Sequence, residues 1–187
     1  MKLFTGVYTA LITPFYQGKI DFDSLGKLVD MQLKAGIAGF IVNGTTGESP
    51  TLTEGETFEI LKFVQEKSKG KAHVVYGSGS NSTAKTIELS KKAEAAGAEG
   101  LLVVVPYYNK PTQRGLKEHF VAVAKSVTLP VMLYNVPGRT ITSLNLETIK
   151  SLSEVKNIVA IKEATGDVGF GRQVILAAGA DFIVSSG

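Results

Sequence analysis

The sequence predicts an α/β protein of the (β/α)8 barrel type, and three observations favour this class of fold. Short apolar segments alternate with longer amphipathic segments, and the apolar segments recur at roughly 25–35 residues, the size of a βα unit. Most apolar segments are continuous rather than alternating, which is typical of parallel strands covered on both faces. Polar residues follow these segments at their carboxyl ends, where the strands of a barrel converge on the active-site face.

Seven apolar segments are predicted to be strands. They are Val7–Ile12, Gly39–Asn43, Val74–Tyr76, Leu101–Val105, Val131–Tyr134, Ile158–Lys162 and Phe182–Ser185. The helices predicted between them lie at Ser24–Ala35, from Thr53 through Val64, and at Thr83–Ala96, Leu116–Ser126, Leu146–Leu152 and Phe170–Ala178. Thr53 and Glu56 have the spacing of a capping box, and Asn145 is a suitable N-cap. Gly97 and Gly179 are suited to end the third and last helices.

No linker or low-complexity stretch divides the chain, so residues 1–187 are predicted to form a single barrel domain. The pattern supplies about seven strands and lacks an eighth βα unit. Because an open barrel leaves two unpaired strand edges, we expect either a fragment or another chain that covers the gap. An open doubly wound sheet is the alternative fold. No Gly-x-Gly-x-x-Gly opens a helix after the first strand, which argues weakly against a dinucleotide-binding fold.

Composition narrows the classes of function. The 20 basic and 17 acidic residues are spread along the chain, which predicts a solvated surface and no nucleic-acid partner. Cysteine is absent and the two histidines, His73 and His119, lie in separate segments, so neither a disulfide nor a metal site is expected. No signal peptide or membrane span is recognisable, and the expected location is cytoplasmic.

The sharpest local signal is Lys162 at the end of an apolar strand. In a barrel this lysine points into the mouth, where partial desolvation lowers its pKa and favours the neutral amine. A neutral amine can form a Schiff base with a keto acid and so supply an electron sink for enamine chemistry. The alternative is a lysine that reaches to solvent or pairs with Glu163.

Three further loops carry candidate groups. The segment Gly44–Ser49 contains two glycines and the hydroxyls of Thr45 and Thr46, which suits a bound carboxylate or phosphate, or else a simple polar turn. Tyr134 can relay protons, and Arg139, five residues on, can hold a carboxylate; a core-edge tyrosine and a surface arginine are the alternatives.

Tyr107 and Tyr108 follow the fourth strand. Because adjacent side chains point in different directions, at most one of them is expected to face the site, and exposed aromatics also suit a subunit interface. Together, the groups at these strand ends fit carbonyl chemistry on an anionic substrate.

The sequence resembles the dihydrodipicolinate synthase family of class I aldolases, to which N-acetylneuraminate lyase also belongs. The resemblance covers essentially the whole chain. It rests on Gly6–Pro14, Gly44–Ser49, Gly77–Asn81, Pro106–Asn109, Tyr134–Arg139, Ile161–Gly166 and Val184–Gly187, in order and at family-like spacing. Members of this family are longer, with an eighth strand and a C-terminal helical region, so the resemblance implies a C-terminally truncated chain.

The resemblance also implies a reaction, that of a lyase in lysine and diaminopimelate biosynthesis. Lys162 would condense with pyruvate, and the enamine would attack L-aspartate 4-semialdehyde to give 4-hydroxy-tetrahydrodipicolinate, with no cofactor beyond the covalent imine. Thr45 and Thr46 would hold the pyruvate carboxylate through their backbone amides, with Gly187 nearby. Tyr134 would act as the general acid and base.

Further roles follow from the same resemblance. Thr45 would link Tyr134 to Tyr108 of a neighbouring subunit in a proton relay, so a homo-oligomer, with a dimer of dimers as its complete form, is implied. Arg139 would bind the semialdehyde carboxylate and favours the synthase over its enzymatic alternatives, N-acetylneuraminate lyase and 2-keto-3-deoxy sugar-acid aldolase. A non-catalytic truncated homologue is a second alternative.

An effector pocket for lysine is also implied. Ser49, Asn81 and Tyr107 match positions of that pocket, whereas Lys85 stands where lysine-inhibited members carry an acidic residue. The Lys85 ammonium would repel a lysine effector, so weak or absent inhibition is expected.

Overall fold

The computed structural model describes residues 2–187 and contains every predicted strand and helix, with ends shifted by a few residues. The strands of the main sheet are β1 (Tyr8–Ala10), β4 (Gly39–Val42), β5 (His73–Gly77), β6 (Gly100–Val104), β7 (Val131–Asn135), β8 (Ile158–Glu163) and β9 (Ile183–Ser186). The predicted helices are α1 (Phe22–Lys34), α2 (Glu54–Ser68), α3 (Thr83–Ala95), α4 (Gln113–Lys125), α6 (Leu146–Ser153) and α7 (Val168–Ala178).

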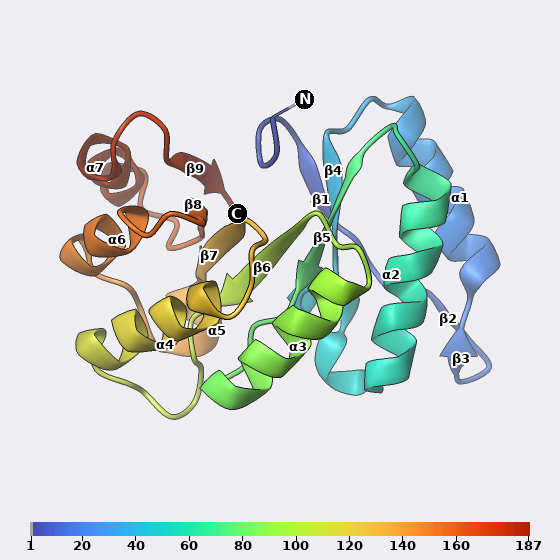
Figure 1. Ribbon diagram of the computed structural model, residues 1–187. Coiled ribbons are helices and arrows are strands. Elements are labelled where there is room, and N and C mark those ends of the chain that lie inside the picture. The colour runs from blue at the N-terminus through green and yellow to red at the C-terminus, as the bar shows by residue number, and fades with distance from the viewer. Residues whose placement is uncertain (1) are drawn as a thin grey trace.

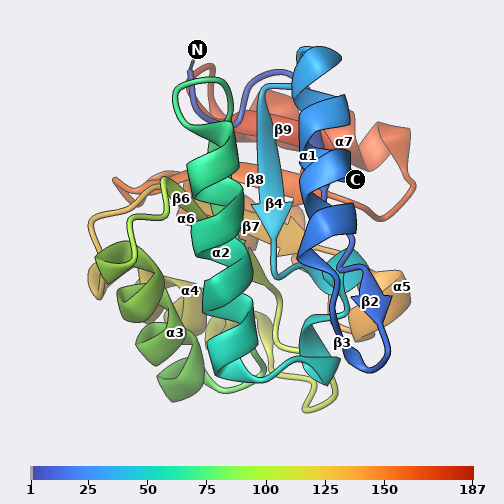
Figure 2. The same ribbon diagram turned by 90° about the vertical axis from the view of Figure 1, so that its right-hand side faces the viewer.

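The seven strands form one parallel sheet in the order β1-β4-β5-β6-β7-β8-β9, so each new strand is added beside the one before it. This order is that of a β/α barrel and excludes a doubly wound sheet, in which the order reverses near its middle. The sheet curls, and the helices lie on its outer side (Figures 1 and 2). Within residues 2–187, β1 and β9 are edges that do not pair with each other, so the barrel is incomplete there, as predicted.

Side chains of successive strand residues enter two different apolar layers. Ile41, Val75, Leu102, Met132 and Ala160 belong to the inner cluster, whereas most of their neighbours along each strand belong to the larger cluster between the sheet and the helices. Because both layers are apolar, the strands read as continuous rather than alternating apolar runs.

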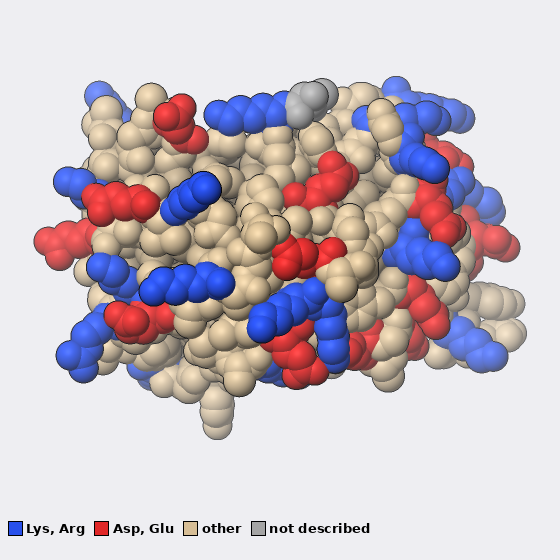
Figure 3. All heavy atoms as spheres, viewed as in Figure 1, with Lys and Arg blue, Asp and Glu red and all other residues tan. Residues whose placement is uncertain are grey.

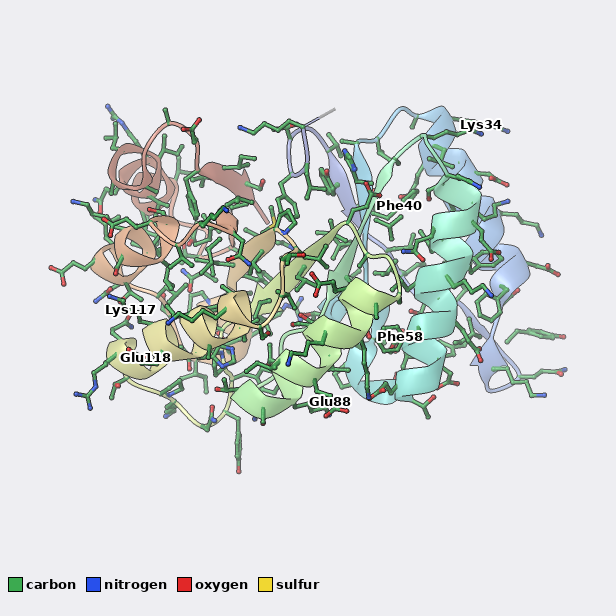
Figure 4. The ribbon with its side chains drawn as sticks, in the orientation of Figure 1. Lys34, Phe40, Phe58, Glu88, Lys117 and Glu118 are labelled. Atoms are coloured by element: carbon green, nitrogen blue, oxygen red, sulfur yellow. The ribbon has the colours of Figure 1, made fainter. Side chains whose placement is uncertain are left out.

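The outer layer fixes the helices against the sheet. Phe40 of β4 is fully buried in it, and Phe58 of α2 stacks on Tyr76 of β5 with ring centroids 5.1 Å apart. The charged residues Lys34, Glu88, Lys117 and Glu118, labelled in Figure 4, are exposed on α1, α3 and α4. On the face drawn in Figure 3, acidic and basic side chains are interspersed.

The predicted caps are confirmed. Thr53 and Glu56 form a capping box at the start of α2, and the Asn145 side chain accepts a hydrogen bond from the Thr148 amide at the start of α6. Gly97 follows the C-terminal cap of α3 with a φ of 79°, which favours glycine. Gly179 is the C-cap of α7.

Short elements went unpredicted because each is only two to four residues long. They are the hairpin of β2 (Phe15–Tyr16) and β3 (Lys19–Ile20), the 3₁₀ turns η1 (Thr45–Gly47) and η2 (Ser49–Thr51), and α5 (Pro137–Thr140). Two of them, η1 and α5, carry site residues. No helix within residues 2–187 has the length and apolar character needed to cross a membrane.

His119 of α4 is a buried imidazole outside any site suggested by the sequence. The residue is 4% exposed, and its Nδ1 lies 2.9 Å from the Thr83 hydroxyl of α3. Its Nε2 has no hydrogen-bond partner among the described residues. Burial lowers the pKa of His119 from 6.5 to about 4, so the ring is neutral in the folded protein at neutral pH.

We predict that His119 makes the fold acid-sensitive. Its pKa is lower in the folded state, so the unfolded chain binds the proton first, and stability falls as pH drops from about 6.5 towards 4. This contribution amounts to roughly 2–3 kcal/mol. In His119→Leu the free energy of unfolding, measured by urea titration at each pH, should change less across that interval. Equal losses in wild type and variant would contradict the assignment.

Candidate active site

Tyr134 and Lys162 lie side by side at the carboxyl ends of β7 and β8. They are paired in the parallel register, and each follows by two residues a member of the inner cluster, Met132 or Ala160. Since side chains two residues apart on a strand point the same way, both project from the inner face of the sheet. The Lys162 Nζ atom lies 4.5 Å from the centroid of the Tyr134 ring.

The surroundings of Lys162 favour its neutral amine. Burial lowers its pKa, and the positive charge of Arg139 lowers it further. The sequence left open an ion pair with Glu163, and that alternative is wrong. Both carboxylate oxygens of Glu163 are engaged elsewhere, one by the Asn135 amide and one by the backbone of Thr165. Lys162 therefore has the burial and charge environment of a nucleophile.

Tyr134 carries a phenol that keeps its proton over a wide pH range. Burial raises its pKa, while the Arg139 charge and a hydrogen bond with the Thr45 side chain act in the opposite direction. The contact with Thr45 joins the loop after β4 to the end of β7. The structure thus brings together three of the four predicted catalytic residues, Lys162, Tyr134 and Thr45.

A cavity of about 240 Å³ opens beside Thr45 and Tyr134, whereas Lys162 is not among the residues that line it. Thr45, Tyr134 and Arg139 line it, together with two residues assigned from the sequence to an effector pocket, Ser49 and Tyr107. Its remaining walls are Asn43, Gly44, Pro50, Gly77, Gly79, Leu102, Val104, Val136 and Thr140. Asn43 and Thr140 were not recognisable as site residues from the sequence, because each is a small polar residue without a diagnostic spacing.

Close backbone packing shapes the wall between β4 and β5. The side-chain amide of Asn43 donates a hydrogen bond of 2.7 Å to the backbone carbonyl of Gly77. The backbone of Asn43 has a positive φ of 57°. A Cβ atom on Gly77 would collide with the Asn43 carbonyl oxygen, so only glycine fits there. On the other side of the loop, the Thr13 hydroxyl donates to the Gly47 carbonyl at 2.7 Å. These contacts fix the turn that carries Thr45.

Gly187 lies against the stem of Lys162. Its amide donates to the Glu163 carbonyl at 3.0 Å, and a Cβ at this position would come within 2.5 Å of the lysine Cε atom. Thr46, the other predicted carboxylate-binding residue, is exposed in η1 beside Thr45.

Tyr108 does not join the site of its own chain. It is 86% exposed, with a positive φ of 74°, and it does not line the cavity, in contrast to Tyr107. This agrees with the prediction that at most one of the two tyrosines faces the site. Asn81 and Lys85, at the start of α3, also lie outside the cavity walls, so the four residues of the expected effector pocket do not share this cavity.

The donor set that converges here comprises one amine, one phenol, threonine hydroxyls and one guanidinium. No three His, Cys, Asp or Glu side chains in the described part of the chain are placed to hold a metal ion. A part-buried lysine beside a phenol, on the C-terminal face of a barrel-type sheet, is an arrangement suited to imine chemistry on carbonyl compounds. The family model described as the dihydrodipicolinate synthetase family matches residues 3–187, and the chain belongs to this family.

Relatives and solved structures agree with this assignment. A 4-hydroxy-tetrahydrodipicolinate synthase of Bdellovibrio bacteriovorus is 57% identical over 187 residues, which is all of this chain and 64% of the relative. The crystal structure of dihydrodipicolinate synthase from Aquifex aeolicus is similar with a TM-score of 0.94 and 44% identity, over 98% of this chain and 63% of that one.

A third similar protein is the chloride-inhibited dihydrodipicolinate synthase from Acinetobacter baumannii, whose structure is a complex with pyruvate. It has a TM-score of 0.95 and 43% identity, over 97% of this chain and 63% of that one. The chain therefore spans just under two thirds of the length of the relatives that it matches.

We predict that Arg139 sustains the reactivity of Lys162. Arg139→Met removes a positive charge that lowers the lysine pKa, so that pKa rises and the neutral fraction at pH 8 falls. Reductive methylation of Lys162, followed by peptide mass mapping with exposed Lys117 as internal reference, should slow by roughly two- to fivefold. Arg139→Lys keeps the charge and should remain close to wild type. An unchanged rate in Arg139→Met would contradict the proposed influence.

Proposed function

We propose that this chain carries out the chemistry of a 4-hydroxy-tetrahydrodipicolinate synthase, the condensation of pyruvate with L-aspartate 4-semialdehyde. The observation that carries the proposal is the pairing of Lys162 with Tyr134 on the inner face of the sheet, together with the cavity that Tyr134 and Arg139 both line. Relatives with this printed name and 57% identity support the choice of reaction.

In the proposed reaction, the neutral Lys162 amine adds to the ketone carbon of pyruvate, and loss of water gives an imine. Loss of a methyl proton then gives an enamine, whose carbon forms a new bond to the aldehyde carbon of the semialdehyde. The aldehyde oxygen takes up a proton and becomes a hydroxyl. The amino group of the second substrate then attacks the imine carbon and displaces the lysine amine, which closes the ring and restores Lys162.

Tyr134 is suited to move the protons in these steps. Its phenol lies next to Lys162, and its raised pKa keeps it protonated before the reaction, so it can donate to the departing water. The Thr45 side chain lies at the same cavity as the phenol and limits the rise of its pKa. We propose that the backbone amides of Thr45 and Thr46 hold the pyruvate carboxylate, with Gly187 leaving room beside the lysine stem.

Arg139 has a second role in this proposal. Its guanidinium lines the cavity, and within residues 2–187 no acidic side chain forms an ion pair with it. A free guanidinium can bind a carboxylate in a bidentate manner, which suits the carboxylate of aspartate semialdehyde.

The exposed position of Tyr108 fits a group offered to a second copy of the chain, so we include in the proposal a homo-oligomer in which Tyr108 completes the relay of a neighbouring site. The homotetramer, the cytoplasmic location, the single domain and the weak response to lysine remain predictions from the sequence.

We predict that pyruvate and borohydride together modify Lys162. The reduced imine is stable, so peptide mass mapping should place the adduct on the Lys162 peptide, and Lys162→Met should lack it. Lys117→Met removes an exposed lysine of α4 and should leave the adduct unchanged. A folded wild-type chain without an adduct on Lys162 would contradict the proposal.

The second substrate is tested separately. Addition of aspartate semialdehyde before borohydride should consume the imine and release a cyclic product that absorbs in the ultraviolet once it is dehydrated. The lyase alternative would replace the synthase if two results were found together. N-acetylneuraminate or a 2-keto-3-deoxy sugar acid would form the adduct on Lys162, and aspartate semialdehyde would not consume the pyruvate imine.

A further inference from the structure

Asn135 and Glu163 form a buried bridge between the last residues of β7 and β8. The two residues are partners in the strand register, directly after the pair Tyr134 and Lys162. The Asn135 Nδ2 atom donates to the Glu163 Oε2 atom at 2.8 Å. Asn135 is fully buried and Glu163 is 7% exposed, so the bridge is shielded from solvent.

The bridge lies on the opposite side of the sheet from the cavity. Asn135 follows Leu133, and Glu163 follows Ile161, by two residues, and both leucine and isoleucine belong to the outer apolar layer. Asn135 and Glu163 are therefore placed to act on the reacting groups through the backbone, without touching a substrate.

Each end of the bridge also anchors a loop. The Asn135 Oδ1 atom accepts the Leu144 amide at 3.0 Å, with the Ser143 hydroxyl at 3.4 Å. These contacts close the loop that leaves β7, contains α5 and carries Arg139. The Glu163 Oε1 atom accepts the Thr165 amide at 2.6 Å, which fixes the turn after β8.

We infer that Asn135 and Glu163 are positioning residues, and that their bridge sets the separation and direction of Lys162, Tyr134 and Arg139. This inference rests on the proposed function, because it assigns those three residues to imine chemistry. Each side-chain nitrogen and oxygen atom of Asn135 and Glu163 has a hydrogen-bond partner. These bonds lie where the two strands end and their loops begin. Such satisfied buried networks select a single local geometry.

The physical reason is the sensitivity of covalent chemistry to distance. A misplacement of about 1 Å at reacting groups can cost about a hundredfold in rate. Beyond the last register pair, one backbone hydrogen bond still joins the two segments, from the Ala164 amide to the Asn135 carbonyl at 2.9 Å. The side-chain bridge adds a second link at the same place. The bridge acts at that pair, one residue from the nucleophile and one from the proton donor.

A double variant in which the amide and the carboxylate exchange positions offers a direct test. In Glu163→Gln the new amide donor faces the Asn135 donor, and in Asn135→Asp the new carboxylate faces that of Glu163. In the double variant N135D/E163Q, the carboxylate introduced at position 135 can accept from both the Leu144 amide and the side-chain amide introduced at position 163. The oxygen of that side-chain amide can still accept from the Thr165 amide. The double variant therefore restores three hydrogen bonds with the direction of the central one reversed.

Asn157→Asp is the matched control. The Asn157 side chain donates to the carbonyls of Ala124, Val127 and Leu129, at the opposite end of the same two strands. The substitution has the same chemistry as Asn135→Asp and removes hydrogen bonds of a comparable kind. It should lower the thermal midpoint and leave the reaction at Lys162 unchanged.

The readout is the rate of pyruvate imine formation per folded molecule, from borohydride trapping at a series of pyruvate concentrations and pH values. Glu163→Gln should lower the maximal rate by about tenfold and shift its pH profile, because Lys162 and Arg139 move relative to each other. The half-saturating pyruvate concentration should change by less than about twofold, because the proposed carboxylate site lies on the β4 loop. The double variant should return to within about threefold of wild type.

Each outcome has a distinct meaning. A wild-type chain that forms no imine would refute the proposed function. A wild-type chain that reacts, alongside a folded Glu163→Gln that reacts equally fast, would overturn the positioning role and leave the proposed function intact. A folded double variant as slow as Glu163→Gln would overturn it too, because restored hydrogen bonds would not have restored the geometry. Recovery in the double variant, with an unaffected Asn157→Asp, supports the inference.

Discussion

The parallel register between β7 and β8 is the constraint on which the rest of the site depends. It pairs Tyr134 with Lys162 and Asn135 with Glu163. Because side chains alternate across a strand, one pair faces the interior of the curl and the other faces the helices. A slip of one residue in either strand would remove the phenol from the amine and could place a carboxylate or an amide on the inner face of the sheet. The same register thus supports reactivity on one face and a satisfied polar bridge on the other.

Burial and charge then adjust the two reacting groups in opposite directions. Desolvation disfavours the charged form of each, which lowers the pKa of Lys162 and raises that of Tyr134. Burial therefore favours the neutral, nucleophilic form of the amine and the protonated form of the phenol. Arg139 lowers both pKa values, so it favours the neutral lysine and limits the rise at the tyrosine. One guanidinium at the cavity wall thereby affects both partners.

Much of this arrangement was predictable from the sequence. Continuous apolar runs of about one strand length predicted parallel strands, and polar residues at their carboxyl ends predicted the face on which the site forms. Lys162 was identifiable because a lysine that ends an apolar strand is unusual. Two things were less accessible. A pattern in one dimension does not define which neighbour a polar side chain meets, so Glu163 remained a candidate partner of Lys162 until its contacts with Asn135 and Thr165 were known. The short turns η1 and α5 lack any periodicity, although they carry Thr45 and Arg139.

A crystal structure of the chain after reaction with pyruvate and borohydride would test the central claim most directly. We expect continuous density from Lys162 Nζ to the reduced pyruvate, with the adduct on the inner face of the sheet beside the Tyr134 hydroxyl. Its carboxylate should lie at the amides of Thr45 and Thr46, and the bridge between Asn135 and Glu163 should be unchanged. Density for the adduct on another lysine, or an adduct at Lys162 that points away from Tyr134, would contradict it.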